Sequence, residues 1–599
     1  MNANLKKVKT IFRSPAISAI FEWSKCVHLR VVLICVLTVT TTLLSLGVTL
    51  TTRDLIDGAI GFHTNAVIKY GAILGCLFIL QRLIAVGLSL LRIDTSSTLQ
   101  KSLQGMLTEE ILTKDYASLR SYHSGNLVNR VFSDMAVVKD GVVSTLPSFV
   151  SIGVSFFGAA AILVSMDWRF VILLLFGGAL GLGLVLLFRN PMKRRHKRMQ
   201  EAEASLHATT QESLENIRLI KASVSENRTL GQIRKRQEVL RKEQVRQGRF
   251  STVMNNSMGM VFDMSWFFCM IWGCISISVG NLTYGSLAAI IQLIGRIQGP
   301  IANAVNLAAR AYGVISSAER LQELTDLPAE EEGENLPDFT SICIENVWFH
   351  YPDSKENVLK NVNCRIRRGD FVALTGISGG GKTSLFQLLL GIYHPTQGSV
   401  YFRKERFAKD ENTATIALLQ TGETKEITED STEARIEESS GNFKESGILK
   451  KVPAGKATRP LFAYVPQGNT LFSGTLRENL TMFTDDASDA AIMKAVKAAC
   501  IDGLVEDIGL EAVLGERGMG LSEGQAQRVA IARALLSGAP VLLLDESTSA
   551  LDEETEAKLL ANISAMRDKT CFIVTHRKAA KTICDYELHI ADRVLTKKV

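Results

Sequence analysis

Six long apolar stretches occupy the first half of the chain, whereas short apolar runs alternate with polar segments in the second half. Each long stretch can cross a hydrocarbon layer of about 30 Å as a helix. The six are Val31–Leu50, Val67–Leu91, Val142–Met166, Phe170–Phe188, Val253–Val279 and Leu287–Tyr312. The pattern predicts a membrane domain of six spanning helices followed by a soluble α/β domain.

The segments between the predicted spans alternate in length. Thr51–Ala66, Asp167–Arg169 and Gly280–Ser286 are short, whereas Arg92–Gly141 and Arg189–Thr252 are long and polar. The second long segment opens with a dense basic cluster, and such clusters stay on the cytoplasmic side of a membrane. We therefore expect both long segments, both termini and the soluble half in the cytoplasm. Within the long segments, Tyr116–Asp134, with a break at Ser124-Gly125, and His207–Glu226 are predicted to be helical, and they would continue the spanning helices beyond the membrane.

Charged residues add two expectations for the membrane half. Residues 1–25 carry several basic residues before a short apolar run, which predicts an amphipathic helix on the cytoplasmic surface and not a cleaved signal. Arg82, Asp263 and Arg296 fall inside predicted spans, where a charge costs about 2.5 to 3.5 kcal/mol on insertion scales. They are candidates for lining a transport path; an ion pair between Asp263 and an arginine is an equally good explanation.

Composition excludes several other classes of protein. The net charge is +6, but the basic residues flank apolar spans, so they indicate membrane topology and not a nucleic-acid surface. The ten cysteines form no C-x-x-C pair, so neither a zinc site nor a disulfide framework is indicated.

A phosphate-binding loop is predicted at residues 376–383, which read GISGGGKT between two apolar runs. Glycines allow the backbone N–H groups to point inward around a phosphate, and the following helix adds its positive dipole end. The nucleotide-binding set is Gly376, Ser378, Gly379, Gly380, Gly381, Lys382, Thr383 and Ser384. In this pattern the lysine reaches the β- and γ-phosphates and Thr383 offers its hydroxyl to Mg²⁺. The loop by itself indicates only a nucleoside triphosphate.

Two further apolar runs end in groups suited to nucleotide hydrolysis. Val541–Leu544 is followed by Asp545, which can order a metal through its water shell, and Glu546, which can polarise the attacking water. Cys571–Thr575 is followed by His576, a possible hydrogen-bond partner of a γ-phosphate. Taken alone, an acidic pair at a strand end is commonly a solvated surface and a lone histidine is more often structural.

A second helix start lies between these strands. Ser522, Glu523, Gly524 and Gln525 precede an apolar helix predicted over Ala526–Leu536, and a helix N-terminus with serine and glycine suits an anion. Tyr351 is the last residue of an earlier strand-like run. Taken alone, an aromatic side chain at this position is most simply explained by packing within the domain.

Taken together, these motifs resemble those of the ATP-binding cassette (ABC) transporters, specifically the exporter-type half-transporters. The motifs are GISGGGKT, YVPQ at Tyr464–Gln467, LSEGQ at Leu521–Gln525, VLLLDE, SALD at Ser549–Asp552 and THR at Thr575–Arg577. They occur in family order over nearly the whole chain. The fold class implied is an all-α transmembrane bundle of six helices followed by an α/β P-loop NTPase domain of ABC type.

The resemblance implies a role for several single residues. Tyr351 would stack on adenine, Gln467 would join the Mg²⁺ site to cytoplasmic docking helices and act in catalysis, and His576 would be the switch histidine. Asp552 would belong to the loop that couples two sites. The stretches Tyr116–Asp134 and His207–Glu226 would be the docking helices. The implied cofactors are ATP and Mg²⁺, with the metal near Thr383, Gln467 and Asp545.

The resemblance also implies dimerisation, because residues 522–525 would complete the ATP site of a second cassette in trans. The partners are then a second half-transporter, identical or different, the lipid bilayer and an amphipathic, lipid or peptide substrate. Expected boundaries are a membrane domain at 1–327, a linker at 328–340 and a nucleotide-binding domain at 341–599. The implied function is ATP-driven export or flipping across the cell membrane by alternating access. The alternatives are a lipid or oligosaccharide-lipid flippase and a channel-like or regulatory ABC protein with weak ATPase activity.

The sequence departs from the family pattern at several places. Glu523 stands where the signature usually has a glycine, which brings a negative charge toward a polyphosphate. Gly468-Asn469 follows Gln467, where an acidic residue is usual. Residues 402–458 form a polar insertion where the family has a shorter connection. An inactive loop or hairpin and a regulatory or partner-binding segment are both open explanations for the insertion.

Overall fold

The structure is a computed structural model, and its chain forms two compact units. It describes residues 15–122, 124–336, 338–405, 448–468, 470–484, 486–515, 518–566, 568–575 and 577–598. The first unit contains the described residues up to Leu112 and from Ser124 to Asp326; the second contains Thr113–Tyr122 and the described residues from Leu327 onward. Residues 1–14 of the predicted N-terminal helix lie outside the described residues.

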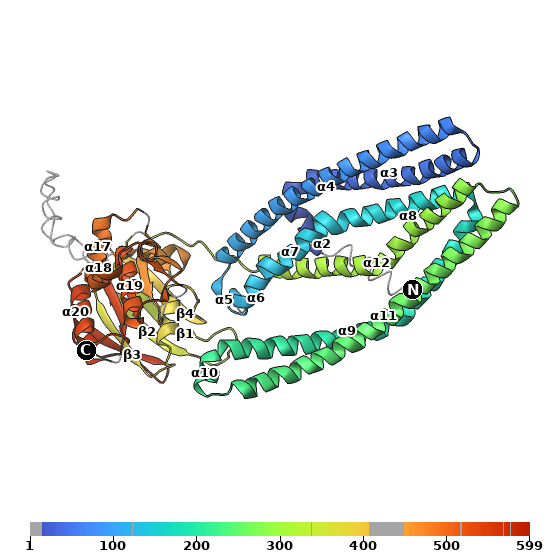
Figure 1. Ribbon diagram of the computed structural model, residues 1–599. Helices are drawn as coiled ribbons and strands as arrows, with labels where there is room; N and C mark the ends of the chain where they lie inside the picture. The colour runs from blue at the N-terminus through green and yellow to red at the C-terminus, as the bar shows by residue number, and fades with distance from the viewer. Residues whose placement is uncertain are drawn as a thin grey trace, which may run out of the picture. The chain divides into compact units, whose positions relative to one another are not determined.

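The first unit is entirely helical, as predicted (Figure 1). Its longer helices are α2 Pro15–Trp23, α3 His28–Ile60, α4 Thr64–Thr113, α8 Leu146–Met166, α9 Trp168–Glu215, α11 Glu226–Ser278 and α12 Tyr284–Thr325. Its short segments are η1 Lys25–Val27, α6 Ser124–Asn129, η2 Arg130–Asp134, α7 Met135–Asp140, η3 Gly141–Thr145 and α10 Ile217–Ala222. Among the described residues, five helical segments are long and apolar enough to cross a membrane, and the sixth predicted span lies within α12.

The spanning helices continue well beyond a bilayer, as expected from the long polar segments. α11 has 53 residues, so at 1.5 Å per residue it is about 80 Å long. It packs along α9, and the short α10 closes this hairpin (Figure 1). α10 begins and ends inside the predicted docking stretch His207–Glu226.

The segment that leads into α8 contains two one-turn π-helices, η2 and η3. Both contact α12. At η2 the carboxylate of Asp134 accepts hydrogen bonds from the guanidinium and the hydroxyl of two α12 residues, Arg320 and Ser317. At η3 a Cβ on Gly141 would lie 2.5 Å from Val314, so only glycine allows this approach. Both interruptions therefore tie the start of α8 to α12.

The second unit is an α/β domain with two main sheets. The larger sheet has the order β12-β11-β3-β10-β9-β6, with parallel pairing from β11 to β6, and the smaller has the antiparallel order β2-β1-β4-β5. The strands of the larger sheet are β3 Phe371–Gly376, β6 Phe462–Val465, β9 Val541–Asp545, β10 Thr570–Val574, β11 Tyr586–Ala591 and β12 Val594–Lys598. Those of the smaller sheet are β1 Ser341–Phe349, β2 Leu359–Arg367, β4 Gln397–Glu405 and β5 Ile448–Pro453. β3, β9 and β10 are buried along their whole length, which accounts for their uninterrupted apolar runs.

Helices pack around the larger sheet, and short elements complete the domain (Figure 1). The helices are α13 Lys382–Leu389, η4 Lys456–Leu461, α16 Leu476–Thr481, α17 Asp489–Ala498, α18 Asp502–Ile508, α19 Glu523–Leu536, α20 Glu553–Ser564 and α21 Lys578–Thr582. The short helix α5 Tyr116–Leu119 also belongs to this unit. Gly474–Thr475 (β7) and Val513–Leu514 (β8) form a two-stranded ribbon. The helix predicted from Ala526 thus begins three residues earlier, at Glu523, because Ser522 caps it.

The predicted linker and insertion are both anchored to the second unit. Three acidic residues of the linker pair with basic residues near η4 and β5, namely Glu330 with Arg459, Glu332 with Lys456 and Glu334 with Lys450. The ends of the predicted 402–458 insertion pair with each other as the antiparallel strands β4 and β5. Residues 406–447 lie outside the described residues.

Candidate functional site

The phosphate loop runs from β3 into α13. Gly376, Gly379 and Gly381 have φ values of 145°, 76° and 102°, which side-chain-bearing residues rarely adopt. A Cβ on Gly381 would also lie 2.9 Å from Leu359. The loop therefore has the glycine-dependent curl that the sequence predicts.

The side chains of the loop divide into buried and exposed groups. Lys382 is buried, and its Nζ donates hydrogen bonds to the carbonyls of Gly376 at 2.9 Å and Ile377 at 3.0 Å. These carbonyls hold the ammonium group inside the loop. Ser378 and Thr383 are exposed, whereas Ser384 is buried.

Three predicted polar groups meet beyond the carboxyl ends of neighbouring strands. β9 ends at Asp545, β6 is followed by Gln467, and the Gln467 side-chain amide donates a 2.7 Å hydrogen bond to the Glu546 carboxylate. Glu546 has a φ of 51°, a strained value for a residue with a side chain. Strain at such a position is typical of functional sites, and here it turns the carboxylate toward Gln467.

The Asp545 carboxylate is almost fully buried beside the phosphate loop. Burial raises its pKa above the ordinary value, and the neighbouring Glu546 charge acts in the same direction. A hydrogen bond with Thr383 and the charge of Lys382 oppose this rise in the pKa. The Tyr464 hydroxyl donates a further hydrogen bond of 3.4 Å. Asp545 is thus linked directly to the threonine of the loop.

His576 lies outside the described residues, but the next residue connects two parts of the domain. The Arg577 guanidinium donates to the carbonyls of Ser549 at 2.9 Å and Leu551 at 2.8 Å. It also forms a 2.8 Å ion pair with the fully buried carboxylate of Glu556. Glu556 in turn accepts a hydrogen bond from Thr548. Arg577 therefore holds the Ser549–Asp552 loop from the segment that follows β10.

The predicted signature residues form a capped helix start. The Ser522 hydroxyl accepts a hydrogen bond from the Gln525 N–H, and the Gln525 side chain accepts one from the Ser522 N–H. Glu523 is exposed in the first turn of α19, where a carboxylate favours the helix dipole. A Cβ on Gly524 would lie 3.0 Å from the Ala550 carbonyl, so the glycine brings α19 close to the Ser549–Asp552 loop.

Tyr351 packs in an aromatic cluster next to the phosphate-loop helix. Its hydroxyl lies 2.8 Å from the Ser384 hydroxyl and donates to Gln387. The Arg120 guanidinium lies over its ring, 4.2 Å from the centroid, and also donates to the Tyr393 hydroxyl. A cation above an aromatic face is attractive. Arg120 belongs to the segment Thr113–Tyr122, which is part of the second unit.

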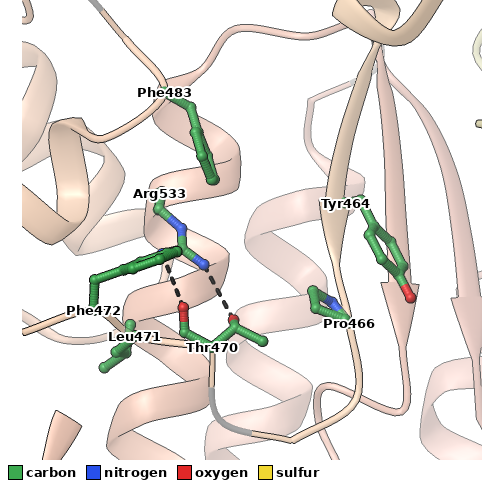
Figure 2. Close-up of a pocket in the computed structure, with 7 residues that line it drawn as sticks. All are labelled: Tyr464, Pro466, Thr470, Leu471, Phe472, Phe483 and Arg533. Atoms are coloured by element: carbon green, nitrogen blue, oxygen red, sulfur yellow. Dashed lines mark hydrogen bonds between the residues drawn. The ribbon is translucent and has the colours of Figure 1, made fainter. Parts of the chain in front are cut away.

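A groove of about 420 Å³, the groove after Gln467, is lined by Tyr464, Pro466, Thr470, Leu471, Phe472, Phe483 and Arg533. Figure 2 shows these lining residues. Arg533 of α19 closes one wall by donating to the carbonyl and hydroxyl of Thr470 at 3.3 Å and 3.1 Å. Phe472 and Phe483 also line it and are more than half exposed. The groove thus exposes apolar surface between α19 and the segment that carries Gln467.

The three charged residues predicted for a transport path are not gathered in one place. Arg296 on α12 donates a 2.6 Å hydrogen bond to the Ser45 hydroxyl on α3. Arg82 on α4 and Asp263 on α11 are exposed. Within the described part of the chain, no ion pair is recorded for Asp263, so the predicted Asp263–arginine pair is not found.

The main contacts that sequence reasoning missed involve arginines. Arg120, Arg533 and Arg577 each join segments that are distant in sequence, so no local pattern marks them. Arg577 was visible only as the last residue of the THR motif. Arg120 was visible only as a basic residue in a predicted docking helix.

The fold and these motifs define an ABC-type ATP-binding domain joined to a helical membrane domain. The model of the ABC transporter transmembrane region matches residues 31–301, and the ABC transporter model matches residues 359–549. The chain belongs to the ABC transporter family, as a type IV half-transporter in which the membrane and nucleotide-binding domains are fused.

Relatives and a solved structure agree with this assignment. The chain is 26% identical to "Probable multidrug resistance ABC transporter ATP-binding/permease protein YheI" of Bacillus subtilis, over 69% of this chain and 64% of that protein. It is also 26% identical to the ATP-dependent lipid A-core flippase of Desulfotalea psychrophila, over 77% of this chain and 74% of that protein. A bacterial Atm1-family ABC exporter with ATP bound has the same fold, with a TM-score of 0.73, 19% identity and coverage of 95% and 94% of the two chains.

The contacts of Arg577 predict that it positions the Ser549–Asp552 loop for turnover. Arg577→Ala should lower both the ATPase rate and the melting temperature of the purified protein, because it leaves the Glu556 carboxylate buried and unpaired. The double variant Arg577→Met with Glu556→Gln removes the unpaired charge. It should recover most of the melting temperature but not the ATPase rate; recovery of both would show that Arg577 is only structural.

Proposed function

We propose that this chain couples ATP hydrolysis to the export or flipping of a substrate across the cell membrane, as a dimer of half-transporters. The observation that carries the proposal is the meeting of the phosphate loop, Asp545, Glu546 and Gln467 beyond the carboxyl ends of β3, β9 and β6. Ligands of open α/β sheets bind at this edge.

The residues divide the work of hydrolysis among them. The loop amides and Lys382 bind the β- and γ-phosphates, and Tyr351 offers its ring to the adenine. Glu546 accepts a proton from the attacking water, while Gln467, hydrogen-bonded to it, holds the carboxylate in place. His576 would bind the γ-phosphate from the end of β10. Positioning and electrostatic stabilisation supply most of the rate in such reactions.

The donor set near the loop fits Mg²⁺ and no softer metal. Thr383 and Asp545 supply oxygen atoms, which Mg²⁺ prefers while it keeps several waters. The described part of the chain contains no cluster of three or more His, Cys, Asp or Glu side chains that would hold a transition metal. Bound Mg²⁺ would neutralise phosphate charge, and Gln467 would lie next to it.

Two exposed apolar surfaces support dimerisation. Around α10, the side chains of Ile217, Leu219 and Val224 are between 49% and 83% exposed at the tip of a long hairpin. The groove after Gln467 exposes Phe472 and Phe483. We assign the groove to α10 of the partner chain, so that movement at Gln467 is passed to the partner's membrane helices. The signature residues 522–525 would in the same way complete the partner's ATP site.

In this scheme ATP closes the two cassettes together and hydrolysis releases them. Binding energy that differs between the open and closed dimers drives the change. The nucleotide-binding domains and both termini would lie in the cytoplasm, as the basic segments indicate. A channel-like or regulatory ABC protein is the less favoured alternative, because the sequence retains Lys382, Asp545, Glu546 and His576.

Glu546→Gln tests the catalytic assignment. The variant should still bind ATP, because the phosphate loop is unchanged, but its ATPase rate should fall by about 10²- to 10⁴-fold, the usual contribution of a general base. Glu553→Gln, an exposed change seven residues away, is the matched control and should hydrolyse ATP normally. A near-normal rate for Glu546→Gln in purified protein would refute the assignment.

Glu523→Gly tests the effect of the unusual signature charge. If Glu523 repels the polyphosphate of the partner's site, its removal should raise the ATPase rate and lower the KM for ATP. Glu523→Gln removes the charge without adding backbone freedom and should give most of the same gain. An unchanged or slower rate in both variants would exclude the repulsion.

Paired cysteines test the partner contact of α10. Leu219→Cys with Phe472→Cys, in a background without the exposed native cysteines, should cross-link to a product of twice the chain mass. Val239→Cys with Phe472→Cys, on the exposed side of α11, should not. A chain that hydrolyses ATP without forming the first product would instead require a different second half-transporter.

A further inference from the structure

A second pocket, in the membrane unit, has the properties of an anion site. It has a volume of about 380 Å³ and collects residues from α3, α4, α8 and α12. Its lining residues are Thr38, Arg92, Ser148, Ser151, Ile152, Leu307 and Arg310. Two of the seven are arginines and none is acidic, so the pocket has a strongly positive lining.

Three other arginines of the same unit are neutralised by carboxylates. Arg30, Arg130 and Arg320 pair with the carboxylates of Asp94, Glu323 and Asp134.

In the described part of the chain, neither Arg92 nor Arg310 has a carboxylate partner. Arg92 makes only a long hydrogen bond of 3.4 Å to Thr38, and its Nε is buried without any partner among the described residues. Arg310 is exposed and Arg92 is partly buried. A partly buried charge without a counter-ion next to the membrane points to a function.

The hydroxyl protons of the pocket are all used in hydrogen bonds within the protein, so only the guanidinium groups can donate hydrogen bonds to a ligand. Thr38 donates to the Ile34 carbonyl at 2.6 Å, and Ser148 donates to the Ser144 carbonyl at 2.7 Å. Ser151 shares a 3.0 Å hydrogen bond with Thr42, whose own proton goes to the Thr38 carbonyl. A ligand must therefore supply acceptor atoms and negative charge.

The position of the pocket indicates what kind of anion it takes. Arg92 directly follows the second predicted span, Ser148 lies near the start of the third, and Arg310 near the end of the sixth. These are the ends predicted to face the cytoplasm. Ile152 and Leu307 add apolar lining, and the volume is too small for a whole lipid but sufficient for a head group.

We infer that Arg92 and Arg310 bind the anionic group, a phosphate, sulfate or carboxylate, of an amphiphilic transport substrate that enters from the cytoplasmic side. This inference rests on the proposed function, because it names the substrate class of the same transporter. Two guanidinium groups are suited to a doubly charged oxyanion, which they bind through charge-assisted hydrogen bonds.

The experiment measures binding without ATP, so that failure of the proposed ATPase would not affect it. The full-length protein in phosphatidylcholine nanodiscs is titrated with lysophosphatidic acid, with lysophosphatidylcholine of the same chain length, and with glycerol 3-phosphate. Thermal stabilisation reports binding. Wild type should bind lysophosphatidic acid at least 10-fold more tightly than the other two probes. Equal binding of the zwitterionic lipid, or equal binding of the soluble phosphate, would overturn the inference.

The variants locate the binding to the two arginines. Arg92→Gln and Arg310→Gln should each weaken lysophosphatidic acid binding by about 10-fold or more, since a charged hydrogen bond contributes that much. Lys101→Gln, an exposed charge removal on the same helix as Arg92, should bind as wild type does. Arg92→Lys keeps the charge, so it should retain more affinity than Arg92→Gln. Unchanged affinity in both glutamine variants, with normal melting temperatures, would refute the site.

Discussion

The parallel pairing of the central strands is the constraint on which the nucleotide site depends. Because β3, β10, β9 and β6 lie side by side and point the same way, whatever follows each strand arrives at one edge. The segments that follow these strands are separated by up to about two hundred residues in the chain. They are the phosphate loop, the residues after Thr575, the Asp545–Glu546 pair and Gln467. Strand pairing brings Gln467 within hydrogen-bonding range of Glu546.

A second constraint is the pairing of arginines with carboxylates in the membrane unit. Three arginines, Arg30, Arg130 and Arg320, pair with carboxylates on neighbouring helices, and the Asp134 contacts also fix the π-helical turn η2 against α12. Pairing of this kind specifies which helices meet. Arg92 and Arg310 have no such partner among the described residues, and at the partly buried Arg92 this leaves a charge for a ligand to neutralise.

Much of the fold could be predicted from the sequence because burial imposes strong patterns. The six spans, the strand–loop–helix at Gly376 and the strand ending at Asp545 all follow from apolar runs that lipid or a sheet interior requires. The order of strands could not be predicted, because it depends on pairing between distant segments. The contacts of Arg120 and Arg577 were hidden for the same reason, and Arg296 was recognised as charged but not as a partner of Ser45.

The segment Thr113–Tyr122 shows how the two halves of the chain are connected beyond the linker. It follows directly from α4, a helix of 50 residues that begins in the membrane unit, yet its residues pack with the second unit. There the Arg120 guanidinium covers one face of the Tyr351 ring, which the family resemblance assigns to adenine. A purine that stacks on that face must displace the guanidinium. If a purine stacks on the opposite face, the guanidinium would strengthen this stacking interaction through the ring. In either case, a nucleotide that stacks on Tyr351 would be affected by Arg120, which belongs to the segment that follows α4.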